Sequence, residues 1–171
     1  MMTLALLVTL GQSPSPQLMT LLQHLESPPT RQQLLEVGGS QVESALNAVV
    51  TDSRRSVRLR GAALAAVAQF DSPSTRALVT QFSLEGPAPL RLAALETIGR
   101  TLTADAALTR VAVTALQADD EVVVRGAIRA LGRVSRQTPA RPESLEALTA
   151  LRARADLSAE TRAQLERALK R

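Results

Sequence analysis

The chain has 171 residues, a length typical of a single domain, and 45% of them are apolar, which is enough to build a folded core. It has no cysteine, which excludes disulfides, thiolate metal sites and a cysteine nucleophile, and no Trp or Tyr, which disfavours stacking sites for bases or flat cofactors. Its formal net charge of +4 is well below the strong basic bias of a dedicated DNA-binding domain.

The apolar segment from Met1 to Gly11 is too short to cross a membrane. No basic residue precedes it, and no clear small-x-small cleavage site follows it, so it does not match a secretory signal peptide. We therefore expect a helix over residues 3–10 that caps one end of the fold, in a cytoplasmic protein.

Prolines divide the rest of the chain into segments with helical apolar periodicity, because proline stops a helix or begins one. No segment alternates apolar and polar residues as a strand does, so the prediction is an all-α fold without a β-sheet. Ser72, Thr103 and Ser158 stand at predicted N-caps, and Gly38-Gly39 at a predicted helix end. In chain order, the predicted helices span residues 3–10, 16–26, 30–37, 40–51, 56–70, 74–84, 88–102, 105–118, 121–136, 142–155 and 158–170.

One short pattern occurs three times, over Arg60–Ala68, Arg91–Gly99 and Val124–Gly132. The copies begin 31 and 33 residues apart (60 to 91 and 91 to 124), a period typical of stacked helix pairs. When the copies are aligned, the same positions are apolar in each, and they form one stripe that a lone helix pair could not bury. The aligned sets are Leu59, Leu90 and Val123; Ala63, Ala94 and Ala127; Leu64, Leu95 and Ile128; and Val67, Ile98 and Leu131.

The third copy resembles the short HEAT repeat of the phycobilisome-lyase type. That family's pattern runs Asp, then Val-Arg, then an Ala pair, then Ala-Leu-Gly, and Asp120, Val123, Ala127 and Leu131-Gly132 fall in register with it. The resemblance implies a right-handed α-solenoid of stacked antiparallel helix pairs, with the second helix of each pair on the concave surface. The predicted single domain, residues 1–171, comprises N-terminal capping helices in 1–39, three HEAT-like pairs in 40–136 and a C-terminal pair in 142–171.

Arg60 and Arg91 hold the place of the family's repeat arginine, whereas the third copy has Val124 there. In HEAT-type repeats the turn aspartate commonly meets the repeat arginine of a neighbouring repeat. The resemblance therefore implies an ion pair between Asp120 and Arg91, with Asp52 and Arg60 as another candidate pair.

Candidate catalytic residues are few. His24 is the only histidine, which excludes a site built on two histidines, and we expect it to be structural near the end of its helix. The one acidic cluster, Asp119 to Glu121, stands at a predicted helix start, where carboxylates accept backbone N–H groups. We predict no catalytic, cofactor-binding or metal-binding residue, and hence a protein that is not an enzyme.

Arginine placement is the one surface signal with a defined shape. Four arginines of the third copy are spaced so that they fall within about 80° on one face of a helix. A second group, from Arg54 to Arg60, clusters at a turn and helix start, where the helix dipole disfavours cations. The candidate partner-binding residues are Arg91, Arg100, Arg125, Arg129, Arg133 and Arg136.

These features predict a noncatalytic scaffold or adaptor that binds a protein partner, an acidic one, on the concave surface of the second helices. A nucleic acid bound by the arginine rows is the alternative, and a bilin lyase or chaperone-like subunit follows from the resemblance alone. A further interpretation is that the arginines form ion pairs within the fold and bind nothing. The sequence sets no oligomeric state.

Overall fold

The computed structural model describes residues 14–24, 28–137 and 142–170, and all regular structure in these ranges is helical, with no strand. This confirms the predicted all-α class, while the predicted helix over residues 3–10 lies outside the described residues. The helices are, in chain order, α1 (Pro16–His24), α2 (Arg31–Gly38), α3 (Val42–Thr51), α4 (Val57–Val67), α5 (Pro73–Leu84), α6 (Ala88–Arg100), α7 (Ala106–Ala115), α8 (Glu121–Val134), α9 (Pro142–Leu151) and α10 (Ala159–Leu169). Short 3₁₀ turns, η1 (Gly39–Gln41) and η2 (Ala68–Phe70), precede α3 and follow α4.

Several helices end before the residue that the sequence predicts. The predicted helix over 105–118 ends at Ala115, and the one over 142–155 ends at Leu151. In both cases the next residues bond three positions back rather than four, as when the N–H of Leu116 donates to the carbonyl of Val113. Tightening of the last turn is common at helix ends, and apolar periodicity does not register it.

The caps show which polar residues begin and end helices. Ser72 and Ser158 are N-caps as predicted, because their hydroxyls accept from the backbone N–H groups three residues later. The prediction for Thr103 is wrong: Asp105 caps α7, with Oδ1 accepting from the N–H of Ala107 at 2.7 Å and of Leu108 at 3.2 Å. A carboxylate oxygen can serve two donors at once, and Thr103 is buried. At the other end of a helix, Gly39 closes α2 with φ +58°, a conformation that favours glycine.

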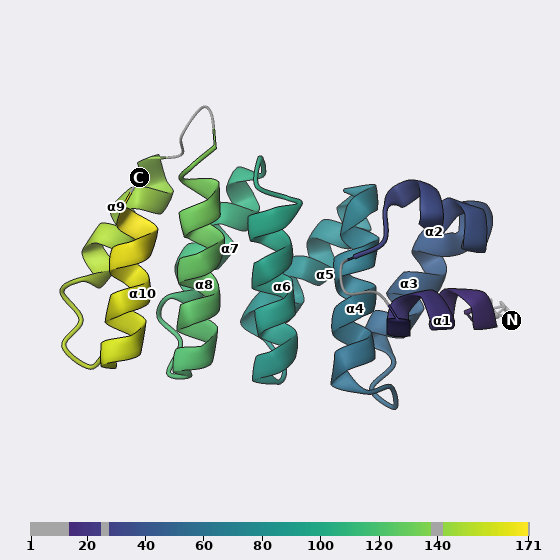
Figure 1. The fold of residues 1–171 in the computed structure, drawn as a ribbon, viewed down its shortest axis with the longest axis horizontal. Coiled ribbons are helices and arrows are strands. Elements are labelled where there is room, and N and C mark those ends of the chain that lie inside the picture. The colour runs from purple at the N-terminus through teal and green to yellow at the C-terminus, as the bar shows by residue number, and fades with distance from the viewer. Residues whose placement is uncertain (1–13, 25–27, 138–141, 171) are drawn as a thin grey trace, which may run out of the picture.

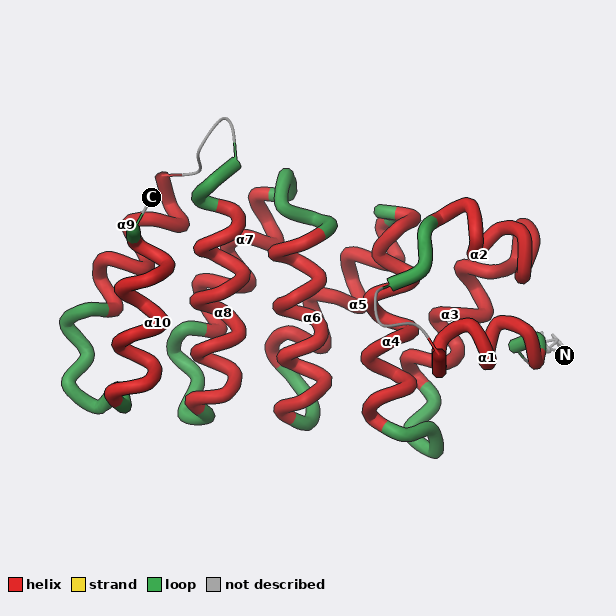
Figure 2. Tube along the Cα trace, in the orientation of Figure 1, coloured by secondary structure: helices red, strands yellow, loops and turns green. Residues whose placement is uncertain are grey.

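The even-numbered helices α4, α6, α8 and α10 lie side by side in chain order and form one row, called here the front row (Figure 1). The odd-numbered helices α3, α5, α7 and α9 lie behind it, and each contacts the even-numbered helix that follows it in the chain. Most of the joining loops are short (Figure 2), and α1 and α2 lie against α4 and α3 at the N-terminal end. Neighbours in the front row therefore come from segments about one repeat apart.

The apolar stripe of the three copies is buried between these layers. Leu64, Leu95 and Ile128, which occupy the same position in α4, α6 and α8, are all 0% exposed. The other aligned apolar positions are buried as well, so the stripe joins one continuous core. The sequence pattern thus identified the core-facing side of α4, α6 and α8 correctly.

Small residues set the spacing of the front row. A Cβ atom placed on Gly99 of α6 would lie 2.7 Å from the Cα of Ala130 in α8, closer than real Cβ atoms come. A Cβ atom on Gly132 of α8 would likewise lie 3.0 Å from the Cβ of Ala168 in α10. Because no side chain separates the helices at these points, α6, α8 and α10 approach one another closely.

The repeat arginines bind backbone carbonyl groups and not the predicted carboxylates. Nε of Arg60 donates to the carbonyl of Val50 at 2.8 Å, and Nε of Arg91 donates to that of Ser83 at 3.4 Å. Both acceptors belong to the last turn of the preceding helix, whose carbonyls lack partners within the helix. The predicted ion pair with Arg91 is therefore wrong, since Asp120 caps α8 through the N–H of Val122.

The predicted pair between Asp52 and Arg60 is also wrong. Asp52 instead binds Arg54 and Arg55, which stand two and three residues after it, at 3.0 and 3.4 Å. The guanidinium of Arg60 stacks over the ring of Phe82, 5.5 Å from its centre. Ion pairs with residues this close in the sequence are favoured, because they cost less conformational entropy than ordering a long side chain across the fold.

Shortening a side chain of the buried stripe will test this packing. We expect Leu95→Ala to lower the free energy of unfolding by about 2–5 kcal/mol, because it removes a fully buried side chain and leaves a cavity. Leu84→Ala is the control: this leucine is 37% exposed, and its loss should cost about 0.5 kcal/mol or less. Urea denaturation followed by circular dichroism measures both, and equal stability of the two variants would contradict the packing.

The close contact of α6 with α8 gives a second prediction. Gly99→Ala should lower the free energy of unfolding, because the steric cost of about 1–3 kcal/mol exceeds the gain of about 1 kcal/mol in helix propensity. Gly61→Ala is the matched control, since its new Cβ would meet only the Cβ of Ala93, at 3.3 Å. Thermal melting of the two variants separates the steric cost from the gain in helix propensity. A raised melting temperature for Gly99→Ala would refute the close approach of α6 and α8.

Candidate functional site

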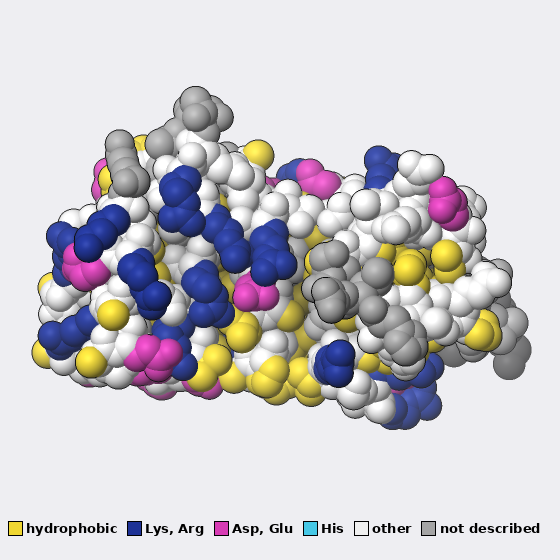
Figure 3. Space-filling model, viewed as in Figure 1, with side chains coloured by type: hydrophobic (Ala, Val, Ile, Leu, Met, Phe, Trp, Pro, Cys, Tyr) yellow, Lys and Arg dark blue, Asp and Glu magenta, His cyan; other side chains and the backbone are white. Residues whose placement is uncertain are grey.

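Four of the predicted partner-binding arginines come together on the front row. Arg129 and Arg133 are four residues apart and share one face of α8, Arg136 follows in the turn that ends this helix, and Arg100 adds its charge from the end of α6. In the space-filling view, basic side chains gather over α6, α8 and α10 (Figure 3). The structure thus brings together residues that the sequence places about one repeat apart.

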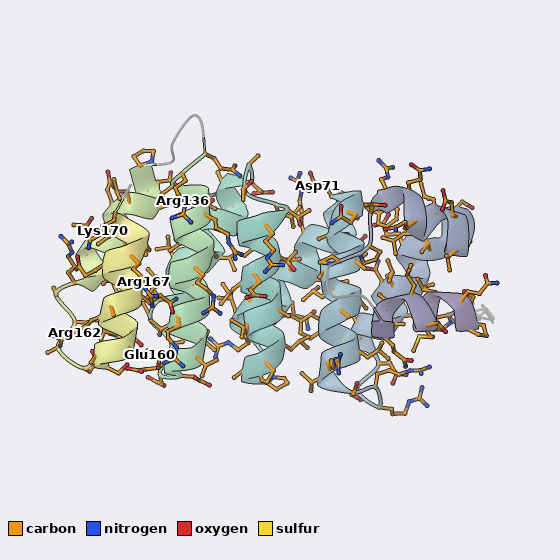
Figure 4. The ribbon with its side chains drawn as sticks, in the orientation of Figure 1. Asp71, Arg136, Glu160, Arg162, Arg167 and Lys170 are labelled. Atoms are coloured by element: carbon orange, nitrogen blue, oxygen red, sulfur yellow. The ribbon has the colours of Figure 1, made fainter. Side chains whose placement is uncertain are left out.

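A groove of about 410 Å³ lies between α8 and α10 beneath this cluster. The groove exists because the small residues Gly132 and Ala168 face each other between the two helices, so no large side chain fills the space above them. Arg136, just beyond the end of α8, and Arg167 of α10 lie on the two sides of the groove (Figure 4). The lining residues are Ile128, Arg129, Gly132, Arg133, Arg136, Gln164, Arg167 and Ala168.

Arg133 lies at the centre of the cluster and lacks a full set of partners. Its Nη1 atom is buried and has no hydrogen-bond partner among the described residues. Burial lowers the pKa of Arg133 most, and the positive charge of Arg100 lowers it next, whereas Glu96 raises it and Arg129 and Arg136 lower it again. A buried, unsatisfied donor among like charges favours the binding of an anion.

Only one carboxylate enters the cluster as the structure describes it. Glu96 of α6 approaches Nη2 of Arg129 at 3.7 Å, a long ion pair between half-exposed side chains. Such a pair contributes little stability and leaves most of the positive charge uncompensated. The arrangement can therefore bind an anionic group without first breaking a strong internal salt bridge.

A second hollow, of about 400 Å³, lies between α4 and α6 and is mainly apolar. Its walls include Val57, Ala65, Pro89 and Ala93. Arg100 and Glu96 line it too, and Glu96 also contacts Arg129 of the groove, so the two hollows are adjacent. Hydrophobic side chains show between α4 and α6 beside the basic region (Figure 3). This hollow was not predicted from the sequence, although Gly61 and Ala65 stand where the third copy has arginines.

The other two predicted residues lie in different surroundings. Arg125 forms ion pairs with Glu160 at 3.3 Å and with Glu121 at 3.6 Å, and so links α8 to α10. Arg91 donates to the carbonyl of Ser83, as described above. Both guanidiniums have partners within the fold, so of the predicted residues Arg129, Arg133 and Arg136 line the groove, while Arg100 lines the adjacent hollow.

Arg167 is the groove residue that sequence reasoning missed. Asp120 is the N-cap of α8, and Ser158 is the N-cap of α10. Arg167 stands as many residues after Ser158 as Arg129 stands after Asp120 (158 to 167 and 120 to 129). Extending the alignment of the three copies to a fourth, anchored on Ser158, would have found it. The weak apolar pattern of α10 concealed that register.

The second arginine group is largely satisfied within the fold. The hydrogen bond from Arg54, more than any other cause, holds the pKa of Asp52 below its ordinary value, and Arg55 bonds the same carboxylate. Arg60 is held by Val50 and Phe82, and Arg58 is exposed beside the apolar hollow. This group therefore orders the turn before α4, and its interactions agree with an internal role.

The acidic cluster is used for helix capping and contacts between helices. Glu121 of α8 accepts from the N–H of Ser158 at 2.7 Å and from the hydroxyl of Thr161 at 3.2 Å, at the start of α10. Across the described ranges, no group of three or more His, Cys, Asp or Glu residues could hold a metal ion. His24 is the last residue of α1, and in the same ranges no helix is long and apolar enough to cross a membrane.

Comparisons of the chain with known protein families, with curated proteins and with solved structures find no match. What the protein binds therefore has to follow from the geometry and charge of its own residues. Those residues form a basic groove between α8 and α10 that adjoins an apolar hollow between α4 and α6.

The contact of Glu121 with α10 predicts a dependence of stability on pH. Hydrogen bonds from Ser158 hold the pKa of Glu121 below its ordinary value of 4.5, so the ionised form stabilises the fold. That stabilisation is present above about pH 4.5 and is lost as the pH falls through the lowered pKa. Glu121→Gln should therefore lower the melting temperature at pH 7 and have a smaller effect at pH 3.

Glu146→Gln is the matched control, because Glu146 is exposed on α9, and it should change the melting temperature little at either pH. Differential scanning calorimetry at both pH values measures the four differences. If Glu121→Gln has the same effect at pH 3 as at pH 7, the charge of Glu121 does not stabilise the α8–α10 contact.

Proposed function

We propose that this protein is a noncatalytic adaptor, a right-handed α-solenoid of the HEAT type, that binds an acidic protein partner on its front row. The observation that carries the proposal is the arginine cluster of α6, α8 and α10, in which the Arg133 side chain has a buried donor without a partner. The proposed location is the cytoplasm, and the proposed domain is the whole chain, with the boundaries predicted above.

Three features support the solenoid. The front-row helices follow one another in chain order, and the same apolar positions are buried in α4, α6 and α8. In successive pairs, moreover, a guanidinium binds a carbonyl near the end of the first helix. Arg60 of α4 and Arg91 of α6 do so for α3 and α5 of their own pairs, whereas α7 receives Nη1 of Arg154, from the loop after α9 in the next pair, through the carbonyl of Leu116 at 2.7 Å. A repeated contact of this kind is what a stack of similar units requires.

Charge supports an acidic partner. Five arginines, two of them on α8 and one in the turn that follows it, stand around the groove and its edge, and Glu96 is the one carboxylate that approaches them in the described structure. Complementary charge speeds encounter and selects partners, while burial of apolar side chains supplies affinity. The apolar hollow between α4 and α6 offers such burial directly beside the basic groove.

A nucleic acid is the second candidate, and the guanidinium cluster is the observation that favours it. Two observations weigh against it. The positions of α4 that match the arginines of α8 are Gly61 and Ala65, so the basic track does not continue along the row. Both phenylalanine rings have an arginine over them, Arg31 over Phe70 and Arg60 over Phe82, and so offer no free platform for a base. The bilin-lyase alternative stays a prediction from the resemblance.

The proposal is tested by neutralising the groove. In the double variant Arg133→Gln/Arg136→Gln, the affinity for a partner protein should fall about tenfold or more, because two charge-assisted contacts are lost. The partner is identified by cross-linking in the native host and mass spectrometry, and then purified so that its affinity can be measured by calorimetry. Arg54→Gln/Arg110→Gln is the matched control, with the same change of charge at exposed residues outside the groove.

The control should bind the purified partner within about twofold of the natural chain, since screened charges outside an interface change affinity little. Equal binding by the two double variants would show that the partner does not use this face. Tight, salt-sensitive binding of a single-stranded oligonucleotide, lost in Arg133→Gln/Arg136→Gln, would replace the protein partner with a nucleic acid.

A further inference from the structure

We infer that the groove between α8 and α10 binds a phosphate monoester, carried as a phosphorylated serine or threonine by the partner protein. The inference rests on the proposed function, because it names the anionic group of the same partner. It depends on three properties of the groove: the number of converging guanidiniums, the unsatisfied donor of Arg133, and a floor made of small side chains.

The floor admits a tetrahedral group between the helices. Gly132 and Ala168 approach so closely that α8 and α10 carry no bulky side chain at this level. The volume of about 410 Å³ is ample for a phosphate and several water molecules. A Cβ atom on Gly132 would lie 3.8 Å from Nη1 of Arg136, which places that guanidinium directly over the floor.

The donors around this floor exceed what a single carboxylate could use. Arg129 and Arg133 line the groove from α8, Arg136 from the turn after α8, and Arg167 from α10. A carboxylate carries one charge and takes one bidentate guanidinium well, whereas a phosphate monoester carries between one and two charges and has three strong acceptor oxygens. Several converging guanidiniums therefore match phosphate better.

Arg133 indicates where the phosphate binds. Its Nη1 donor is buried and unpaired, and burial together with the neighbouring arginines lowers its pKa. An anion in the groove would stabilise the charged guanidinium, and a turn of the side chain toward it would give the buried Nη1 an acceptor. Glu96 meets only part of this need, since it contacts Arg129 at 3.7 Å.

The surroundings of the groove favour a phosphorylated polypeptide over a nucleic acid. A nucleic-acid backbone needs phosphate contacts at regular intervals along its path. Here the basic cluster stops at α6, and the next hollow along the row is lined by apolar residues such as Val57, Pro89 and Ala93. A peptide with a phosphorylated residue and an aliphatic residue some distance away fits both hollows.

The site is tested first with O-phosphoserine as a probe on the full chain. In NMR titrations that follow the guanidinium Nε–Hε signals, O-phosphoserine should shift Arg133, Arg136 and Arg167, whereas acetate at the same ionic strength should not. Arg54 and Arg110 are internal controls, because both are exposed and lie outside the groove. Shifts at Arg54 as large as those at Arg133, or equal shifts with acetate, would overturn the site.

The second arm uses the purified partner before and after phosphatase treatment. Dephosphorylation should weaken binding to the natural chain about tenfold or more and should change binding to Arg133→Gln/Arg136→Gln by less than about twofold. If dephosphorylation has no effect while the double variant still binds more weakly, the phosphate inference fails and the proposed function stands.

If the double variant binds the partner normally, the proposed function fails, and the O-phosphoserine titration then decides separately whether the groove is a phosphate site. A third arm titrates a short single-stranded oligodeoxynucleotide. Shifts of the same guanidinium signals at a lower concentration than O-phosphoserine requires would assign the groove to nucleic acid and overturn the inference.

Discussion

The close approach of α6, α8 and α10 through small residues is the constraint on which the rest of the structure depends. Gly99 lies against Ala130, and Gly132 against Ala168, with no room for a side chain between the helices. This spacing fixes the register of one front-row helix against the next. It therefore decides which side chains of neighbouring repeats meet, and it leaves the shallow floor above which the arginines gather.

The arginines of this chain divide into two groups by their partners. Some bind acceptors that the fold itself supplies, as Arg60, Arg91 and Arg154 do when they bind carbonyl groups near helix ends. Arg162 does the same for the loop before α10, through the carbonyls of Ala155 and Leu157. The first three contacts satisfy carbonyl groups that a helix leaves open at its end, and all four tie one element to the next.

The other arginines converge where acceptors are scarce. Arg100, Arg129, Arg133 and Arg136 repel one another, and Glu96 offsets this only weakly. The fold tolerates the cost because the close helix packing beneath them is held by buried apolar and small residues, which the charges do not disturb. A surface of this kind is stabilised further when an anion binds, which connects the packing of the stack to the proposed recognition of a partner.

Much of the helical organisation could be predicted locally. Proline placement and apolar periodicity predicted every helix that the structure describes, because each depends on residues within a few turns of one another. The exact ends were less predictable. Asp105 rather than Thr103 caps α7, since which side chain bonds the first free N–H groups depends on burial as well as residue type.

By itself, the sequence determined the helices, the apolar stripe and the face of α8 that Arg129 and Arg133 share, because all three follow from helical geometry within one segment. The tertiary structure alone decided which arginines have hydrogen-bond acceptors within the fold and which lack them. Arg154 binds the carbonyl of Leu116, 38 residues away, and Arg167 joins the groove from another helix. Acceptors so distant in the chain have no periodic signature, since only the packing of neighbouring helices brings them within reach.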